Sequence, residues 1–313
     1  MKRILYILIM TAFALHANAQ LLYEVSGRAS KKKSYILAIN RYVNMQFLDT
    51  IPNVFQCFAK CNKVVTEFTM QDYEALAALR QAAILPDSIR LTNFYTEEQL
   101  EYIDQNLLIN IGMGLDKLSR MKPSYLTEML RTELMKQWLH YDEQTSMESF
   151  FEYVAAERGI PVIGLDEIGE TMYMLFDREP FHWQCDELLK VSEFPEREVK
   201  QERTIKDMYL SGRLADISYQ IESPDNKSSI SYSDYKIYCA RNKEWVKRLQ
   251  PYLQEGAAFI TLNAIYLGGD KGLLQLLRAA GYRVRPVNRG LLTKKNIQLE
   301  PIIFNNNKTI KQQ

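Results

Sequence analysis

Residues 258–287, near the C-terminal end of the chain, constrain the fold more than any other stretch. A run of apolar and β-prone residues comes first, a glycine-rich turn at 268–272 follows, and a leucine-rich segment ends at Gly281 before a second β-prone run. This order predicts a buried strand over 257–262, a turn, an amphipathic helix that Gly281 terminates, and a strand over 282–287. Such a unit is typical of an α/β protein.

The rest of the chain combines short strands with long helical segments. Strands are predicted at 21–26 and 34–40, which form a hairpin around a polar turn, and at 64–68, 160–165 and 297–303. Helices are predicted at 47–60, 69–85, 96–111, 123–137, 147–158, 169–176, 186–214 with a break at Pro195, and 235–253. Because strands lie toward both chain ends, we expect an α/β fold with a central mixed β-sheet built from strands of both ends and flanked by helices.

The order of residues at the N-terminus is that of a secretory signal peptide. Two basic residues precede an apolar block over 4–15, and the small residues Ala17 and Ala19 follow. We predict cleavage before Gln20 and export to the periplasm or cell envelope. The apolar block is shorter than the roughly 20 residues that a bilayer-spanning helix needs, and no later segment is long enough, so no membrane span is predicted.

The remaining chain has no linker rich in proline, glycine or serine. Single α/β domains reach this length, so we predict a signal peptide over 1–19, one domain over 20–304 and a flexible tail over 305–313. The polar segment 223–233 is predicted to be a surface loop.

Charge and motif content exclude several classes of function. The chain has 39 Lys and Arg against 38 Asp and Glu, a net charge of +1, which argues against nucleic-acid and anionic-membrane partners. It contains no Gly-x-Ser-x-Gly elbow, no Walker loop and no dinucleotide fingerprint. No cofactor is predicted.

Four cysteines remain in a compartment that permits disulfides. Cys57 and Cys61 are four apart on a predicted helix, where the Cβ separation of about 5–6 Å exceeds the ~3.8 Å that a disulfide prefers. Cys185 with Cys239 is the preferred pairing. The alternative is that all four are buried thiols acting as small apolar residues.

Several segments resemble, in the same order, the motifs of one family. The strand at 64–67 ends in Glu67, and the segment 161–166 ends in Asp166. Arg241 with Asn242 resembles an Arg-Asn pair that opens the penultimate long helix of that family, before the strand, turn and helix described above. This chain thereby resembles the TraB/PrgY/GumN family, which includes the Tiki-type metalloproteases. The resemblance covers most of the chain and implies the fold of a metal-dependent peptidase.

The departures from the family pattern are concentrated at the motifs that are presumed to bind the metal. The family has two Gly-x-x-His motifs that supply presumed metal ligands. Here Ala38 and Asn263 stand at the glycine positions, and Arg41 and Tyr266 at the histidine positions. Glycines that serve turns remain. The resemblance therefore implies a degenerate site, and no bound metal is predicted.

The histidines that remain after signal-peptide removal do not restore such a site. His140 is predicted at a helix end and His182 among aromatic residues, and two isolated histidines show no ligand spacing. Cys57 lacks a nearby candidate base for nucleophilic catalysis.

The resemblance predicts that the loops at 38–41 and 263–266 lie side by side, with Glu67 and Arg241 next to them. Arg41 beside Glu67 would supply the positive charge that a metal ion otherwise provides, because arginine is the best bidentate partner of a buried carboxylate. The alternative is that Arg41 is an exposed loop residue.

Two interpretations of the remaining polar cluster stay open. Glu67, Asp166 and Arg241 could perform general acid/base hydrolysis, or they could form an inherited ion-pair network. We predict a catalytically degenerate, metallopeptidase-like binding protein whose partner is an envelope protein or peptide, with an active hydrolase as the alternative. Haem or metal trafficking has only fold-level similarity to support it. The candidate binding residues are Arg41, Asn263 and Tyr266.

Overall fold

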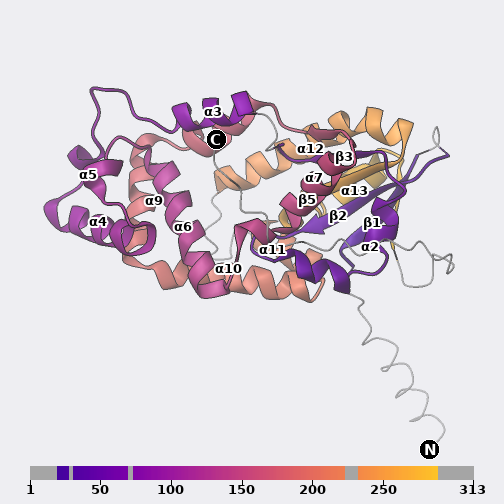
Figure 1. Ribbon diagram of the computed structural model, residues 1–313, viewed down its shortest axis with the longest axis horizontal. Helices are drawn as coiled ribbons and strands as arrows, with labels where there is room; N and C mark the ends of the chain where they lie inside the picture. Colours follow the sequence, from indigo (N-terminus) through magenta and orange to yellow (C-terminus); the bar gives the residue numbers. More distant parts are fainter. Residues whose placement is uncertain (1–19, 28–30, 70–72, 223–231, 288–313) are drawn as a thin grey trace, which may run out of the picture.

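The structure, a computed structural model, describes residues 20–27, 31–69, 73–222 and 232–287. The predicted signal peptide, the strand at 297–303, the tail and most of the predicted loop lie outside these ranges. Within them, no helix is both long and apolar enough to cross a membrane. The described chain is elongated, with a β-sheet toward one end and a group of helices at the other (Figure 1).

The predicted mixed sheet is confirmed. Its four neighbouring parallel strands have their carboxyl ends at one edge, and β1 runs antiparallel to both β2 and β6. This common edge is where open α/β sheets place their ligands. The six strands, in spatial order, are β4 (Val162–Gly164), β3 (Lys63–Thr66), β5 (Ala258–Asn263), β2 (Ser34–Ile39), β1 (Leu22–Ser26) and β6 (Arg283–Pro286).

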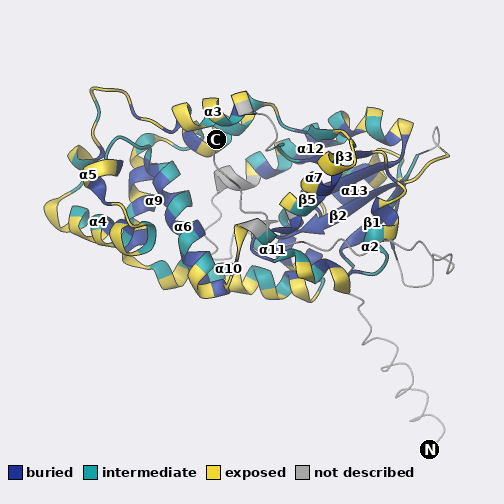
Figure 2. Ribbon diagram, viewed as in Figure 1, coloured by how far each residue is buried: buried dark blue, intermediate teal, exposed yellow. Residues whose placement is uncertain are grey.

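The central strands are mostly apolar, as expected of strands that are buried on both faces. Every residue of β2 and the first five residues of β5 are buried (Figure 2). Phe58 of α2 (Val54–Phe58), Phe151 of α7 (Met147–Glu157) and Phe259 of β5 pack together with ring centroids 4.7–5.2 Å apart. These contacts anchor helices against the sheet.

Further helices complete the sheet end. The long helix α12 (Tyr232–Glu255) buries Trp245 and Leu249 on its apolar face. It packs on α13 (Leu273–Ala279), which also contacts β6. Helix α11 (Leu214–Glu222) lies against the turn that follows β5.

The other end of the molecule is helical and has apolar clusters of its own. It contains α4 (Glu97–Ile111), α5 (Leu115–Leu118), α6 (Pro123–Leu139) and α9 (Phe181–Glu193). One cluster includes Leu107, Leu126 and Leu188, and another includes Leu130, Met135 and Val191.

Helix α10 (Pro195–Leu210) connects the two ends (Figure 1). Near its C-terminus, the buried Tyr209 donates a hydrogen bond from its hydroxyl to the carbonyl of Ala38 in β2, at 2.9 Å. Two further helices lie outside these groups, α3 (Tyr73–Ala82) and α8 (Ile168–Met172), and a π-helical turn at Tyr173–Asp177 follows the second.

The prediction of one helix over 47–60 was wrong. The segment forms a 3₁₀ helix, Met45–Thr50, and then the short α2. Pro52 cannot donate a backbone hydrogen bond, and Asn53 adopts the left-handed conformation with φ of 63°. These two residues therefore interrupt the helix before α2 begins at Val54.

The turn after β5 requires glycine at position 272 for a steric reason. A Cβ atom on Gly272 would lie 1.7 Å from the carbonyl oxygen of Gly268, so the turn closes only without a side chain there. Gly281, with φ of 90°, then ends α13 as predicted.

The preferred cysteine pairing was also wrong, because all four cysteines are free thiols. Cys185 is buried on α9 in the first apolar cluster of the helical end, whereas Cys239 lies on α12. Burial raises the pKa of Cys57 and Cys185 to about 11 and that of Cys61 to about 12. These three thiols therefore stay protonated and act as small apolar side chains, as in the alternative interpretation.

Candidate functional site

Polar residues from four strands meet at the carboxyl edge of the parallel strands. Asn40 follows β2, Glu67 follows β3, Asp166 lies two residues after β4, and Asn263 ends β5. Ile39 is the register partner of Asn263, so the loops at the ends of β2 and β5 lie side by side, as predicted.

Arg241, in the middle of α12, connects the two carboxylates of this edge. Its Nε donates to Asp166 Oδ2 at 2.9 Å, and its Nη2 lies 3.2 Å from Glu67 Oε2. Its Nη1 donates to the hydroxyl of Tyr266. One fixed guanidinium therefore contacts three of the predicted site residues.

Two aromatic rings hold this guanidinium in place. Arg241 Cζ lies 4.4 Å from the ring centroid of Trp245 and 4.8 Å from that of Tyr266. Tyr266 in turn stacks on Tyr238 with centroids 5.7 Å apart. Cation–π contacts of this kind favour arginine over lysine.

Each carboxylate also has a second donor. Trp245 Nε1 donates to Asp166 Oδ1 at 2.6 Å, and the backbone N–H of Asn263 donates to Glu67 Oε1 at 2.7 Å. The exposed fraction is 8% for the side chain of Asp166 and 16% for that of Glu67. Both groups are thus held by a cation and a neutral donor in a largely buried setting.

Burial controls the ionisation of this network. Desolvation raises the pKa of Glu67 even though Arg241 and the Asn263 N–H favour its ionised form. Desolvation also raises the pKa of Tyr266 to about 12, so its phenol is neutral. For Arg241, burial disfavours the charge, but Tyr266, Glu67 and Asp166 outweigh it and raise its pKa.

The arginine that contacts Glu67 is Arg241 and not Arg41, which corrects one prediction from the sequence. Arg41 Nη1 lies 3.3 Å from Glu128 Oε2 on α6, and the Arg41 side chain is half exposed. The physical reason is that Arg41 lies past the end of β2, where the chain faces the helical end of the molecule. The positive charge beside Glu67, which was expected from Arg41, is therefore supplied by Arg241 of α12.

Trp245 and Tyr238 belong to this site although neither was predicted from the sequence to be a site residue. Both lie on α12 one helical turn from Arg241, at spacings of four and three residues, so they share its face. Asn242, the neighbour of Arg241, is buried and donates from Nδ2 to the carbonyls of Tyr266 and Lys271. It thereby fixes the loop that carries Tyr266.

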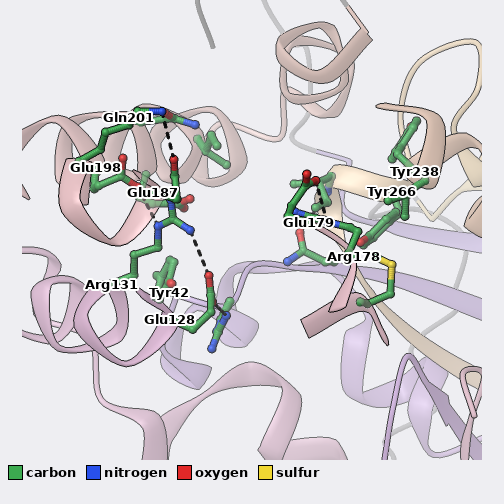
Figure 3. A pocket seen from close by; sticks show the side chains of 18 of the residues that line it. Tyr42, Glu128, Arg131, Arg178, Glu179, Glu187, Glu198, Gln201, Tyr238 and Tyr266 are labelled. Carbon is green, nitrogen blue, oxygen red and sulfur yellow. Dashed lines mark hydrogen bonds and ion pairs between the residues drawn. The ribbon is translucent and has the colours of Figure 1, made fainter. Parts of the chain in front are cut away.

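A cleft of about 690 Å³ lies between the sheet edge and the helical end (Figure 3). Asn40, Arg41, Asn263 and Tyr266 line one part of it, so the three predicted binding residues share one cavity. The opposite part is lined by residues of α6, α9 and α10. The volume is in the range of small-molecule and peptide-side-chain sites.

The helical side of the cleft contains an ion network that sequence reasoning missed. Arg131 of α6 pairs with Glu128 at 3.2 Å, with Glu198 of α10 at 2.9 Å, and with Glu187 of α9. The spacing of Glu128 and Arg131 on one helix was a visible signal, but the partners on α9 and α10 are brought in only by helix packing.

The described residues contain no group of three His, Cys, Asp or Glu side chains placed to hold a metal ion. His140 is exposed at the C-terminus of α6, which confirms its predicted place at a helix end. His182 is exposed on α9 with its ring against Trp183, 6.0 Å between centroids. Neither histidine lines the cleft.

Comparison with known proteins identifies one family. The chain matches the TraB/PrgY/gumN family over residues 21–286, which is most of its length, and it belongs to that family. No curated protein and no solved structure matches it.

Proposed function

We propose that this TraB/PrgY/gumN family member is an exported, catalytically degenerate binding protein of the periplasm or cell envelope. Its contact surface is the cleft at the carboxyl edge of the sheet, and its partner is a peptide or a protein segment. The observation that carries the proposal is the engagement of both Glu67 and Asp166 by the guanidinium of Arg241.

The chemistry of this arrangement opposes metal-dependent hydrolysis. A guanidinium offers no lone pair to a metal ion, and its charge repels a second cation beside the same carboxylates. Arg41 and Tyr266 stand where the family has imidazoles, and a phenol with a pKa of about 12 is a poor ligand in its neutral form. The site is therefore built for a fixed internal cation.

The surroundings of Asp166 also oppose acid/base chemistry. Its two oxygens accept hydrogen bonds from Arg241 and Trp245, and its side chain is 8% exposed. A catalytic carboxylate must reach the proton that it transfers. Asp166 is better suited to positioning α12 against β4.

An active hydrolase is the second candidate, and one observation favours it. The pKa of Glu67 is raised by burial, which is the direction that prepares a carboxyl group to act as a general acid near neutral pH. In this hypothesis Glu67 donates the proton and Arg241 stabilises the developing negative charge. Glu67→Gln would then abolish turnover without loss of the fold.

Calorimetry with Mn²⁺, Co²⁺ and Zn²⁺ on the purified protein tests the proposal. We expect no binding at micromolar concentrations and no cleavage of a mixed peptide library with or without these ions. Metal binding that Glu67→Ala abolishes would contradict the binding-protein role. Metal-free cleavage that Glu67→Gln abolishes would establish the hydrolase instead.

Export has its own test. A mature chain that begins at Gln20 is expected in the cell envelope fraction, because Ala17 and Ala19 match the small-residue positions of a cleavage site. Intact mass spectrometry of the protein from that fraction measures it. A mass that includes residues 1–19 would contradict export by this route.

A further inference from the structure

Two deeply buried polar side chains face the cleft without using all of their hydrogen-bonding groups. Asn40 is 4% exposed and Tyr42 is 7% exposed, and both line the cavity. Asn40 Oδ1 accepts from the backbone N–H of Tyr42 at 2.9 Å. Among the described residues, the amide NH₂ of Asn40 and the hydroxyl of Tyr42 have no hydrogen-bond partner. The two atoms themselves are not fully enclosed by protein, so a ligand that enters the cleft can reach both of them.

The lining of the whole cleft has an excess of carboxyl groups. Six acidic and four basic side chains line the cavity. Each basic side chain already pairs with a carboxylate: Arg131 with three glutamates, Arg41 with Glu128, Arg178 with Glu179 at 3.3 Å, and Lys190 with Glu187 at 3.9 Å.

Glu202 of α10 lies at the Tyr42 end of the cleft and takes no part in these ion pairs. It lines the cavity, is partly buried, and has no hydrogen bond or ion pair to any described residue. It lies close enough to Tyr42 to contribute, after burial, to the raised pKa of that phenol. A neutral phenol and an unpaired carboxyl group therefore lie near each other at one end of the cleft.

We propose that this end of the cleft binds a primary ammonium group, with Glu202 as its ion-pair partner and the Tyr42 hydroxyl as a hydrogen-bond acceptor. The inference rests on the proposed binding role of the cleft and specifies the chemistry that it recognises. An ammonium group has three donors and one positive charge, which match a carboxylate and a hydroxyl oxygen. It would also relieve the excess of acidic groups.

The remaining surfaces of the cleft fit the rest of such a ligand. The free NH₂ of Asn40 can donate to a carbonyl oxygen on the same molecule. Ile237 and Ile265 line the cavity, as does the stacked pair Tyr238 and Tyr266, and these side chains offer contact to an aliphatic chain. Figure 3 shows the two tyrosines on the side of the cleft opposite to Tyr42 and Arg131. A lysine side chain in a peptide has all three features, and a free diamine has the ammonium and the aliphatic chain.

The ionisation of Glu202 adds a pH dependence to this recognition. Burial raises its pKa to about 7, so it is about half ionised at neutral pH. Ammonium binding favours the ionised form, and affinity is expected to increase from pH 6 to pH 8. The charged and titratable groups that face Glu202 are Arg131 and Glu128 on α6, Glu198 on α10, and Arg41 and Tyr42 after β2.

Calorimetry of the full mature chain with defined probes tests the proposal. The probes are acetyl-Ala-Lys-Ala-amide, its norleucine counterpart without the ammonium group, and 1,5-diaminopentane. Binding of the lysine peptide is expected to weaken roughly ten- to a hundredfold in Glu202→Gln and in Tyr42→Phe, as for other hydrogen bonds to charged groups. Glu196→Gln, an exposed glutamate on the same helix, is the matched control and is expected to change nothing.

The outcomes separate this inference from the binding role itself. Equal binding of the lysine and norleucine peptides would overturn ammonium recognition and leave the binding role in place. No binding of either cationic probe at millimolar concentration would also overturn it. Binding of both cationic probes would show that the amine alone suffices, whereas binding of the peptide alone would identify a peptide as the source. Circular dichroism of both variants verifies that they fold.

Discussion

Arg241 and Arg41 have different surroundings, although either could have been the cation beside Glu67. Arg241 contacts two largely buried carboxylates and two rings, whereas Arg41 is half exposed and pairs with Glu128 across the cleft. Removing one partner of a buried ion network leaves uncompensated charges, and an exposed pair contributes little. The two arginines therefore differ in their expected contribution to stability.

We expect Arg241→Gln to lower the free energy of unfolding by about 3–5 kcal/mol. Arg41→Gln, the matched control, should lower it by less than about 1 kcal/mol. Urea denaturation followed by circular dichroism measures both values. Equal effects of the two substitutions would show that the guanidinium of Arg241 is not the centre of the network.

The ionisation of Glu202 is expected to make the stability of the protein depend on pH. Its pKa is raised from 4.5 to about 7, so between these values the folded state binds more protons than the unfolded state. Stability from this group is therefore lost as the pH rises through that window. Glu202→Gln removes the effect and should stabilise the protein by about 1–3 kcal/mol at pH 8, with no gain at pH 4.5.

Thermal melting at several pH values checks this sign, with Glu196→Gln as the control for a change of charge on the same helix. A gain in Tm that is larger at low pH than at high pH would contradict the expectation, because Glu202 would then be ionised and stabilising in the folded state.

At the scale of the element, short signals in the sequence set several boundaries. A capping box opens α4 at the predicted position, with the Thr96 hydroxyl accepting from the Gln99 N–H at 3.3 Å and the Gln99 side chain accepting from the Thr96 N–H at 3.0 Å. Gly159, with φ of 64°, lies just past the predicted end of the helix over 147–158. These signals work because each depends on neighbours in the chain only.

The turn between β5 and α13 is the element most sensitive to substitution. Gly272→Ala places a Cβ atom 1.7 Å from the carbonyl oxygen of Gly268 and should destabilise the fold by at least about 2–3 kcal/mol. Gly169→Ala in α8 is the matched control, because a Cβ there meets nothing within 4 Å. That control is expected to be neutral or stabilising by up to about 1 kcal/mol. A neutral Gly272→Ala in urea denaturation would contradict the steric account.

At the scale of the whole molecule, the two ends of the chain must come together before a site exists. Glu67 and Asn40 come from the N-terminal strands, whereas Arg241 and Asn263 lie near the C-terminal end, and β2 pairs with β5. The cleft then forms where this edge faces the helical end. Its chemistry is therefore a property of the complete fold.

The family pattern suggests an expectation at this scale. Restoring both motifs with Ala38→Gly, Arg41→His, Asn263→Gly and Tyr266→His should give some Mn²⁺ or Zn²⁺ affinity, because two neutral imidazoles would join Glu67 at one edge. That affinity is expected to be weak, because Arg241 keeps its positive charge beside Glu67. Calorimetry compares this variant with the unaltered chain, and Glu67→Ala in the restored background is the control. Binding that survives that control would place the metal elsewhere.

The sequence alone determined the α/β class, the sheet that unites both ends, most helix boundaries and the family. The α/β class and the helix boundaries follow from periodicity and local turn chemistry, which depend on residues that are near one another in the chain. The family was inferred from the likeness of several segments to its motifs. It also pointed to Glu67, Asp166, Arg241, Asn263 and Tyr266 as one cluster, through their likeness to family motifs.

Only the tertiary structure decided which side chains make contact. It placed Arg241 instead of Arg41 beside Glu67, left Cys185 and Cys239 unpaired, and brought Glu202 of α10 to the same cleft as Tyr42. Pairings of this kind depend on helix packing and on burial, both of which act between residues far apart in sequence. No local pattern determines them, because the same arginine or glutamate can face solvent or a partner according to how the elements pack.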